Sequence, residues 1–488
     1  MSISFNQVPN NIRVPFIYVE FDSSRAAAGA GNVPFKTLII GQKTASGTAT
    51  AGERVAVTSP AKAADLYGNG SQLARMIDSF RTAAPLAEAD AVALDDLGAG
   101  VAAAGNITIT GTATETGILS VTLAGRLLQV GVNNGDTATA TGDALESAIN
   151  AAVYLPVTAS NAAGVVTITA KNKGEAGNDI KIIINKNSGE KTPGGLTVVS
   201  TAMSAGAGNP DITAAFAAAG DDLYQVITAA YTDAANLTVI ENELARKWGP
   251  LVQAGGVYIS TVNKDLTSAQ TLGNSKNSAF ISISNLYGTP SATDEVSAEL
   301  AGTVAQAAEI DPARPFQTLK LNKTLAPNAN DRFTIQENNT LLNSGIATLI
   351  FNDAGEVRVQ RLISTYKTNE AGGPDVSYLD INTPLTLEYI RQDFKNYILG
   401  KYPRHKLAND GANFGPGQPV ITPKVGKAEA IKKFKDWETA GLVEGLEQFK
   451  NELICERNAQ DPNRLDWQMS PDLINQFRVG GVKIQFLL

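Results

Sequence analysis

The residue types that perform most protein chemistry are scarce in this chain of 488 residues. It has one histidine, His405, and one cysteine, Cys455. A single histidine excludes metal sites built from two histidines, and a histidine-assisted nucleophile would depend on this side chain alone. His405 stands between Arg404 and Lys406, which favours an exposed or interfacial basic loop. One cysteine permits no internal disulfide, and Cys455 is interpreted as a small buried hydrophobic residue on a helical face.

Adjacent carboxylates occur at three places, and such pairs can act as general acid and base. More often they lie on solvated loops or first helical turns, and we favour that interpretation. The pairs are Asp95–Asp96, Asp221–Asp222 and Asp294–Glu295. Neither GxxxxGK[ST] nor GxSxG occurs, and GAGVAAAG lacks the GxGxxG spacing. We therefore predict that the protein is not an enzyme and has no catalytic residues, no metal site and no cofactor.

The composition is that of a globular protein, with 43% hydrophobic and 18% charged residues. A net charge of −8 argues against direct nucleic-acid binding, which needs a basic face. No apolar run is long enough to insert into a membrane, and the N-terminus lacks the features of a secretory signal, so we expect folding in a cytoplasm. One segment, residues 424–435, is basic. Its candidates for contact with an acidic partner are Lys427, Lys432, Lys433 and Lys435, and a solvated helix face is the alternative.

The elements that must carry these residues follow an α/β pattern. Residues 35–43 read as a buried strand, and apolar residues at helical spacing predict helices over 71–80, 233–248 and 383–400. They also predict a helix within residues 290–315 that stops where Asp311 precedes Pro312. Residues 96–205 differ, because short β-type runs alternate there with Gly and Asn turns around one helix. The sequence predicts an α/β (α+β) core in two parts, 21–95 and 206–475, with a mostly-β outer domain inserted at 96–205.

The two ends of the chain are predicted to be extended arms, at residues 1–20 and 476–488. The last seven residues, VKIQFLL, place Val482, Ile484, Phe486 and Leu488 on one face of a strand. A terminal strand of this kind must pair with a sheet and cover an apolar surface. Burying four such side chains contributes roughly 1.5 to 3 kcal/mol each before ordering costs.

Long segments at both ends of the sequence resemble the contractile tail sheath proteins of Mu-like phages. They include ISFNQVPNNIRVPFIYVEFDSSRA near the N-terminus, and VRVQRLISTYKTNEAGGPDVSYLDINTPLTLEYIRQDF and ERNAQDPNRLDWQMSPDLINQFRV near the C-terminus. The resemblance covers about residues 3–90 and 206–488. It does not extend to the 96–205 insertion.

The resemblance implies a structural subunit of the virion tail. Such subunits form hexameric rings stacked as a helical sleeve around the tail tube, and the sleeve contracts on a baseplate signal to drive the tube through the host envelope. The implied partners are other copies of the chain, the tube protein, and the baseplate and tail terminator proteins. The arms would pair with a small sheet of a neighbouring copy, and residues 424–435 would lie near a tube-facing helix. The N-terminal arm residues are Ile3, Phe5, Val8 and Ile12, and the hinge residues of the C-terminal arm are Gly480 and Gly481.

Two alternatives remain open from the sequence. The same sleeve occurs in DNA-free tailocins and other contractile injection systems. A protein of a different class, an adhesin or a glycan-binding surface protein, is suggested by the β-rich insertion.

Overall fold

The computed structural model describes residues 35–352, 354–415 and 417–487. They divide into two compact units, one of residues 35–388 with 473–488 and one that includes residues 389–472. The division falls between Glu388 and Tyr389, inside a region that the sequence suggested was a single core part, 206–475. The predicted N-terminal arm residues Ile3, Phe5, Val8 and Ile12 lie outside the described residues, as does Leu488.

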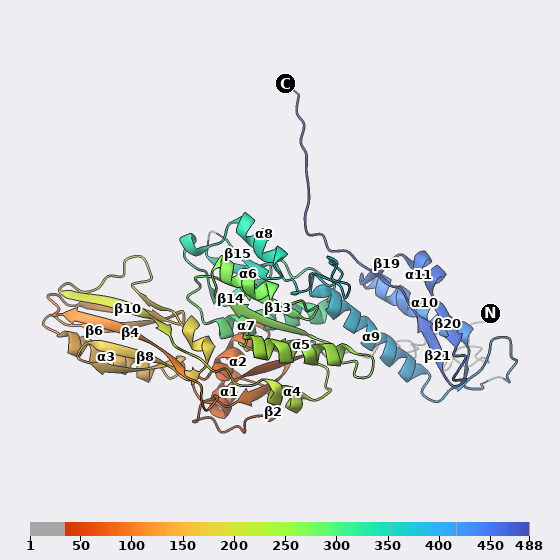
Figure 1. Cartoon of the computed structure of the whole chain (residues 1–488), viewed down its shortest axis with the longest axis horizontal. Helices are drawn as coiled ribbons and strands as arrows, with labels where there is room; N and C mark the ends of the chain where they lie inside the picture. The colour runs from red at the N-terminus through yellow and green to blue at the C-terminus, as the bar shows by residue number, and fades with distance from the viewer. Residues whose placement is uncertain (1–34, 353, 416, 488) are drawn as a thin grey trace, which may run out of the picture. The chain divides into compact units, whose positions relative to one another are not determined.

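The larger unit is built on a nine-stranded mixed sheet (Figure 1). Its order is β14-β16-β15-β13-β12-β11-β1-β3-β2, parallel from β15 to β3 and antiparallel at both edges. The strands are β1 Lys36–Gln42, β2 Arg54–Ala56, β3 Glu88–Leu94, β11 Val226–Thr228, β12 Val257–Val262, β13 Ile281–Asn285, β14 Lys320–Leu325, β15 Ala347–Phe351 and β16 Glu356–Arg361. The central strands are buried on both faces, which is typical of parallel sheets and explains their continuous apolar runs.

Helices cover both faces of this sheet, because alternate side chains of each strand enter separate cores. Ile39 of β1 packs with α2 and α7, whereas Leu38 and Ile40 pack with α4 and α5. The predicted helices at 71–80, at 233–248 and within 290–315 are confirmed as α2, α5 and α7. The helices are α1 Pro60–Tyr67, α2 Gln72–Ala83, α4 Thr213–Ala219, α5 Ala234–Trp248, α6 Leu266–Asn274, α7 Thr293–Ile310 and α8 Ile335–Asn343.

Between β3 and α4 the chain builds two further antiparallel sheets around a core of their own. Their strand orders are β10-β4-β8-β7 and β6-β5-β9, and they pair with no strand of the nine-stranded sheet. Leu119, Leu145 and Ile168 belong to this core. The elements are β4 Ala102–Gly111, β5 Gly117–Leu123, β6 Arg126–Val132, α3 Ala138–Ala151, β7 Val157–Ala162, β8 Val165–Lys173, η2 Glu175–Asp179, β9 Ile182–Ile184 and β10 Leu196–Ser204.

The second unit consists mainly of helices with short strands, and its first helix begins in the larger unit. Helix α9, Asn382–Lys401, begins one residue before the predicted cap Thr383 and ends one residue after Gly400, so neither residue is a cap. In the core, the ring of Phe434 on α10 stacks on that of Phe449 on α11, with centroids 4.1 Å apart. The other elements are β17 Lys406–Leu407, β18 Val420–Ile421, α10 Pro423–Thr439, β19 Val443–Glu444, α11 Leu446–Glu452, β20 Ile454–Arg457, β21 Leu465–Gln468 and β22 Asp472–Leu473.

Candidate functional site

Residues 479–487 form an extended and exposed end of the chain. They lie in no helix or strand, and no backbone hydrogen bond joins them to another described residue. The side chains of Val482, Ile484 and Phe486 are 85%, 82% and 78% exposed. Three large apolar residues at alternate positions are thus presented to solvent, and their burial would require a surface from outside this segment.

The predicted hinge residues, Gly480 and Gly481, lie at the start of this exposed end. Neither has a positive φ angle. A Cβ added to Gly481 would meet nothing within 4 Å, and one added to Gly480 would meet only the ring of Phe477, at 3.3 Å. The conformation described here does not require glycine at either position, so the hinge remains a prediction.

The β20–β21 hairpin is a two-stranded sheet with unpaired outer edges. No described strand pairs with the outer edge of β20 or β21. One face of the hairpin packs on α10, where Trp467 donates from Nε1 to the carbonyl of Gly426 at 3.1 Å. A Cβ on Gly426 would lie 2.8 Å from Cys455 Sγ, which explains the glycine at this close approach. Within residues 35–352, 354–415 and 417–487, both outer edges of the hairpin therefore lack a strand partner.

The nine-stranded sheet lacks an open edge of this kind. At one edge, β14, the backbone amide of Lys323 donates to Glu299 Oε1 at 2.7 Å, and that of Leu325 donates to Ser291 Oγ at 2.9 Å. These side chains from α7 and the loop before it occupy donors that an added strand would need. At the other edge, β2 is only three residues long.

Helix α10 carries the basic segment. The four lysines predicted to contact a partner differ in their exposure to solvent. Lys432 and Lys435 are exposed and Lys427 is half-buried. Lys427 and Lys435 are eight residues apart, so they lie on one side of the helix, with Ile431 between them. Lys432 instead bonds Asp436 at 2.9 Å, and this hydrogen bond raises the pKa of Lys432.

Lys433 is not a surface residue, so the prediction that it contacts a partner is wrong. Its side chain is 4% exposed, and Nζ lies 2.7 Å from Asp393 Oδ2. The same carboxylate accepts a hydrogen bond from Trp437 Nε1 at 2.6 Å. A buried ammonium must be paired, and Lys433 lies on the side of α10 that faces α9. Its charge holds the two helices together.

A second carboxylate, which lies on α10, strengthens the contact between α9 and α10. Glu429 accepts hydrogen bonds from the hydroxyls of Tyr397 and Tyr402 and from Lys401 Nζ, the last at 2.7 Å. Burial and the bond to Glu429 raise the pKa of both tyrosines to about 12. These hydroxyls therefore stay protonated as donors at any ordinary pH.

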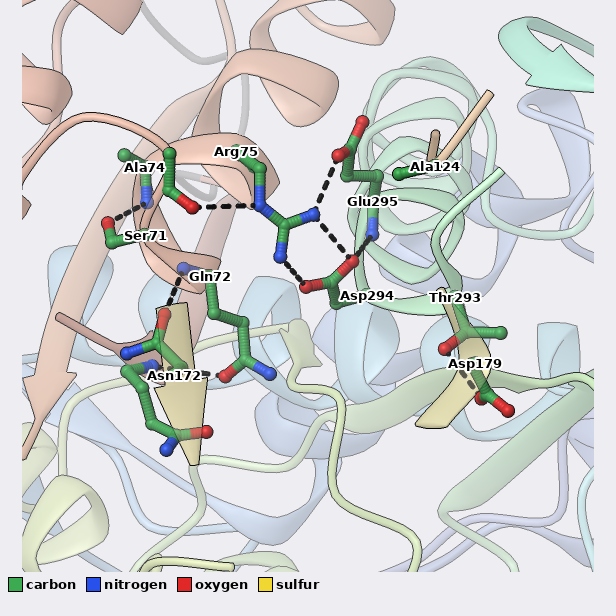
Figure 2. Close-up of polar contacts among 12 residues, drawn as sticks. Ser71, Gln72, Ala74, Arg75, Ala124, Asn172, Asp179, Thr293, Asp294 and Glu295 are labelled. Atoms are coloured by element: carbon green, nitrogen blue, oxygen red, sulfur yellow. Dashed lines mark hydrogen bonds and ion pairs between the residues drawn. The ribbon is translucent and has the colours of Figure 1, made fainter. Parts of the chain in front are cut away.

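A largely buried cluster of two arginines and two carboxylates lies at the N-terminus of α7. Figure 2 shows three of its members, Arg75, Asp294 and Glu295. Arg75 of α2 donates to both Asp294 and Glu295, with Nη1 at 3.2 Å and 2.7 Å from them. Arg126 binds the carboxylate of Glu295 with both Nη atoms, at 2.9 Å and 2.8 Å. The side chains of Asp294 and Glu295 are 4% and 10% exposed. The expectation that this pair is solvated is therefore wrong.

The cluster joins the part of the larger unit built on the nine-stranded sheet to the part built on the two inserted sheets, because Arg126 begins β6. A two-residue turn of Ala124 and Gly125, with φ angles of 48° and 79°, connects β5 to β6 and brings Arg126 beside α7. Burial alone would raise the pKa of Glu295, but Arg75 and Arg126 outweigh it and hold that pKa below its usual value. Glu295 is thus ionised at neutral pH.

Further polar contacts connect the inserted sheets to the rest of the larger unit. Asp96 accepts from Gln42 Nε2 at 2.7 Å, Asn172 Nδ2 at 3.0 Å and the amide of Lys173 at 3.0 Å. Thr293 donates to Asp179 at 3.0 Å. Asp95, Asp221 and Asp222 are exposed, as expected of solvated acids, and they pair with Lys43, Arg246 and Arg54.

The isolated histidine and cysteine occupy structural positions. His405 is exposed and lies edge-on to the ring of Tyr402, with centroids 4.8 Å apart. Cys455 is half-buried on β20, not on a helix as predicted, and burial raises the pKa of its thiol to about 11. Within residues 35–352, 354–415 and 417–487, no three His, Cys, Asp or Glu side chains are arranged to hold a metal ion. Over the same residues, no helix has the length and apolarity to cross a membrane.

Comparison with known proteins identifies the family. Residues 205–365 match the central domain of phage tail sheath proteins, and residues 374–486 match the tail sheath C-terminal domain. The chain is 38% identical over 488 residues to the Mu-like prophage FluMu tail sheath protein of Haemophilus influenzae, covering all of both chains. The chain belongs to the tail sheath proteins of Mu-like phages. This sheath protein is accordingly a structural subunit of a contractile phage tail, and its C-terminal domain holds both the exposed end and the β20–β21 hairpin.

Solved structures similar to the sheath protein share little sequence with it. The sheath tail protein of Desulfitobacterium hafniense is 13% identical, with a TM-score of 0.48, over 94% of this chain and 100% of that one. The contracted helical sheath of the anti-feeding prophage is 11% identical, with a TM-score of 0.49. The match covers 98% of this chain and 99% of that one.

Sequence reasoning missed the buried cluster, although the sequence carried a signal for it. Ala, Gly, Val and Leu occupy many positions around helix α7, and its residues 293–302 are all buried. Carboxylates in its first turn therefore had to be paired rather than solvated. The identity of the partners, Arg75 and Arg126, could not be read from the sequence, since they lie about 170 to 220 residues away.

Proposed function

We propose that this sheath subunit forms hexameric rings that stack as a helical sleeve around the tail tube. A baseplate signal makes the sleeve contract and drive the tube through the host envelope. Family membership supports this role. The observation that carries it here is the exposed apolar end at residues 479–487, because such a surface is stable only when another copy covers it.

The exposed end adds as a strand to the β20–β21 hairpin of a neighbouring copy. That hairpin is supported by α10 and has open edges, whereas β14 and β2 are capped or short. Burying Val482, Ile484 and Phe486 contributes roughly 5 to 9 kcal/mol before ordering costs. Backbone hydrogen bonds fix the direction and register of the added strand.

During contraction the subunits rotate as rigid bodies while the arms stay paired. The extended sleeve is a metastable state, held by contacts with the tube and baseplate, and the contracted form gains new contacts between cores. Lys427 and Lys435 on α10 face an acidic tube wall in the extended state. The sheets within residues 96–205 lie on the outside of the sleeve, because they have a core of their own and their exposed apolar side chains, such as Ile118, Val153 and Val199, are distributed over separate elements.

Negative-stain electron microscopy of the purified protein tests this proposal. The full-length chain is expected to form tubular polymers, and a chain that ends at Gly480 is expected to stay as folded subunits. The double variant Ile484→Asp/Phe486→Asp should behave like the truncation. Its matched control, Lys483→Ser/Gln485→Ser, changes the opposite face of the same segment and should polymerise. Normal tubes from the truncated chain would contradict the exchange of arms.

A further inference from the structure

The residues just before the exposed end are held on the body of their own unit. Gln476 donates from Nε2 to the carbonyl of Ala313 at 3.0 Å, and the carbonyl of Phe477 accepts from Gln317 Nε2 at 3.3 Å. Arg478 makes the last of these contacts. The Phe477 side chain is already 79% exposed although its carbonyl is bound, whereas residues 479–487 form no backbone hydrogen bond with another described residue. The change from a bound to a free chain therefore occurs within one residue.

Arg478 lies in a polar socket formed by four side chains, one of which is Gln476, whose Oε1 accepts from Arg478 Nη2. Its Nη1 donates to Gln317 Oε1 at 3.3 Å, and its Nη2 lies 3.1 Å from Asp380 Oδ1 and 3.2 Å from Asn382 Oδ1. The side chain is 11% exposed. Burial lowers the pKa of this guanidinium, and the carboxylate of Asp380 opposes that effect. Asn382 is also fixed, because its Nδ2 donates to the carbonyls of Pro312 and Arg314, both at 2.8 Å.

The socket is connected to the nine-stranded sheet. Arg361, the last residue of β16, binds the same carboxylate of Asp380 with Nε at 3.0 Å and Nη2 at 2.8 Å. The backbone of Asp380 also forms an antiparallel bridge with Ile363. Strand β16 is paired on both sides, to β14 and β15. A pull on the C-terminal segment therefore passes from Arg478 through Asp380 and Arg361 into an interior strand.

We propose that Arg478 is the anchor that transmits tension from the C-terminal arm to the sheet and sets the length of arm free to reach another copy. This inference rests on the exchange of arms proposed above. The ten residues after Arg478 can span at most about 33 to 36 Å. A planar guanidinium fork suits this task, because it bonds several fixed oxygens at once. Without the Arg478 side chain, the free arm would be longer, and its effective concentration at the acceptor strand would fall.

Two matched insertions test whether the free arm begins at Arg478. The sequence Gly-Ser-Gly-Ser is inserted either after Arg478 or between Asn475 and Gln476, in the full-length chain. The insertion after Arg478 lengthens the free arm, so its polymers are expected to dissociate at lower urea, as measured by light scattering and electron microscopy. The insertion before Gln476 is isolated from tension by the anchor and should leave dissociation unchanged. Equal weakening by both insertions would overturn the proposal.

A substitution tests the side chain itself. In Arg478→Gln we expect the ratio of polymer to free subunit to fall by about tenfold or more, the effect of losing a charge-assisted hydrogen bond. The unfolding midpoint of the free subunit should stay close to that of the wild type, and Arg478→Lys should recover part of the loss. The control Arg246→Gln removes an exposed arginine paired with Asp221 and Glu243 and should change neither quantity.

The outcomes separate this inference from the proposed function. If the chain ending at Gly480 polymerises normally, arm exchange itself is wrong. If that truncation fails to polymerise while Arg478→Gln polymers match those of Arg246→Gln, only the anchor is wrong. Should Arg478→Gln fail to fold, the two insertions decide, because they alter no contact of the socket.

Discussion

Replacement of Glu295 by glutamine should weaken the junction between the inserted sheets and the nine-stranded sheet. The variant keeps the shape of the side chain but removes the charge that Arg126 binds with two hydrogen bonds and Arg75 with one. Arg126 would then lose its carboxylate partner, and Arg75 would keep only Asp294. Breaking a buried ion pair from one side costs about 3 to 5 kcal/mol, and we expect a loss in that range because Glu295 is 10% exposed.

The assay combines urea unfolding with amide hydrogen exchange. Exchange should quicken first in β5, β6 and the first turn of α7, where the junction lies. The control Glu88→Gln removes a carboxylate whose side chain is 64% exposed and lies 3.5 Å from Lys36, and its cost should stay within about 1 kcal/mol. The double variant Glu295→Gln/Arg126→Met removes the unpaired arginine and should recover much of the loss. Equal stability of Glu295→Gln and Glu88→Gln would show that the charge of Glu295 does not stabilise this junction.

The same pair of proteins should show a pH dependence. The pKa of Glu295 is lower in the folded protein than its usual value, so its contribution to stability is complete above the unfolded pKa of about 4.3. That contribution is lost as the pH falls through the lower, folded pKa. The difference in unfolding free energy between the wild type and Glu295→Gln should therefore shrink below about pH 4, and a difference independent of pH would contradict the ionised pair.

Three further predictions concern the remaining contacts. Lys433→Ala should destabilise the second unit by about 3 to 5 kcal/mol in urea unfolding, because it leaves Asp393 buried without its cation, whereas Lys432→Ala should cost about 1 kcal/mol or less. Lys427→Glu/Lys435→Glu should reduce co-sedimentation of the sheath with purified tubes at low salt, with the difference narrowing as salt is added; an unchanged yield at low salt would exclude electrostatic contact with the tube. Removal of residues 102–204 together with Glu295→Gln should preserve tubular polymers in electron micrographs, since the substitution neutralises the carboxylate that loses Arg126; loss of polymers from a folded variant would place these sheets in the subunit interface.

Elements with strong periodicity could be predicted from the sequence. The buried strand at 36–42 and the helices α2, α5 and α7 were predictable, because their apolar side chains repeat with the period of one surface and their ends carry caps or prolines. The sequence also indicated the family through long matching segments, and the alternation of Val482, Ile484 and Phe486 at the exposed end.

Whether a charged side chain lies on the surface or in the core depends on the packing of distant segments and could not be predicted from the sequence. Lys432 and Lys433 are neighbours in a basic run, yet one pairs on the surface and the other is buried against Asp393. Asp294 and Glu295 resembled a solvated first turn, and their partners come from distant elements. Local sequence fixes the period of a helix, but the direction of its buried face and the partners of its charges depend on contacts between segments far apart in the chain.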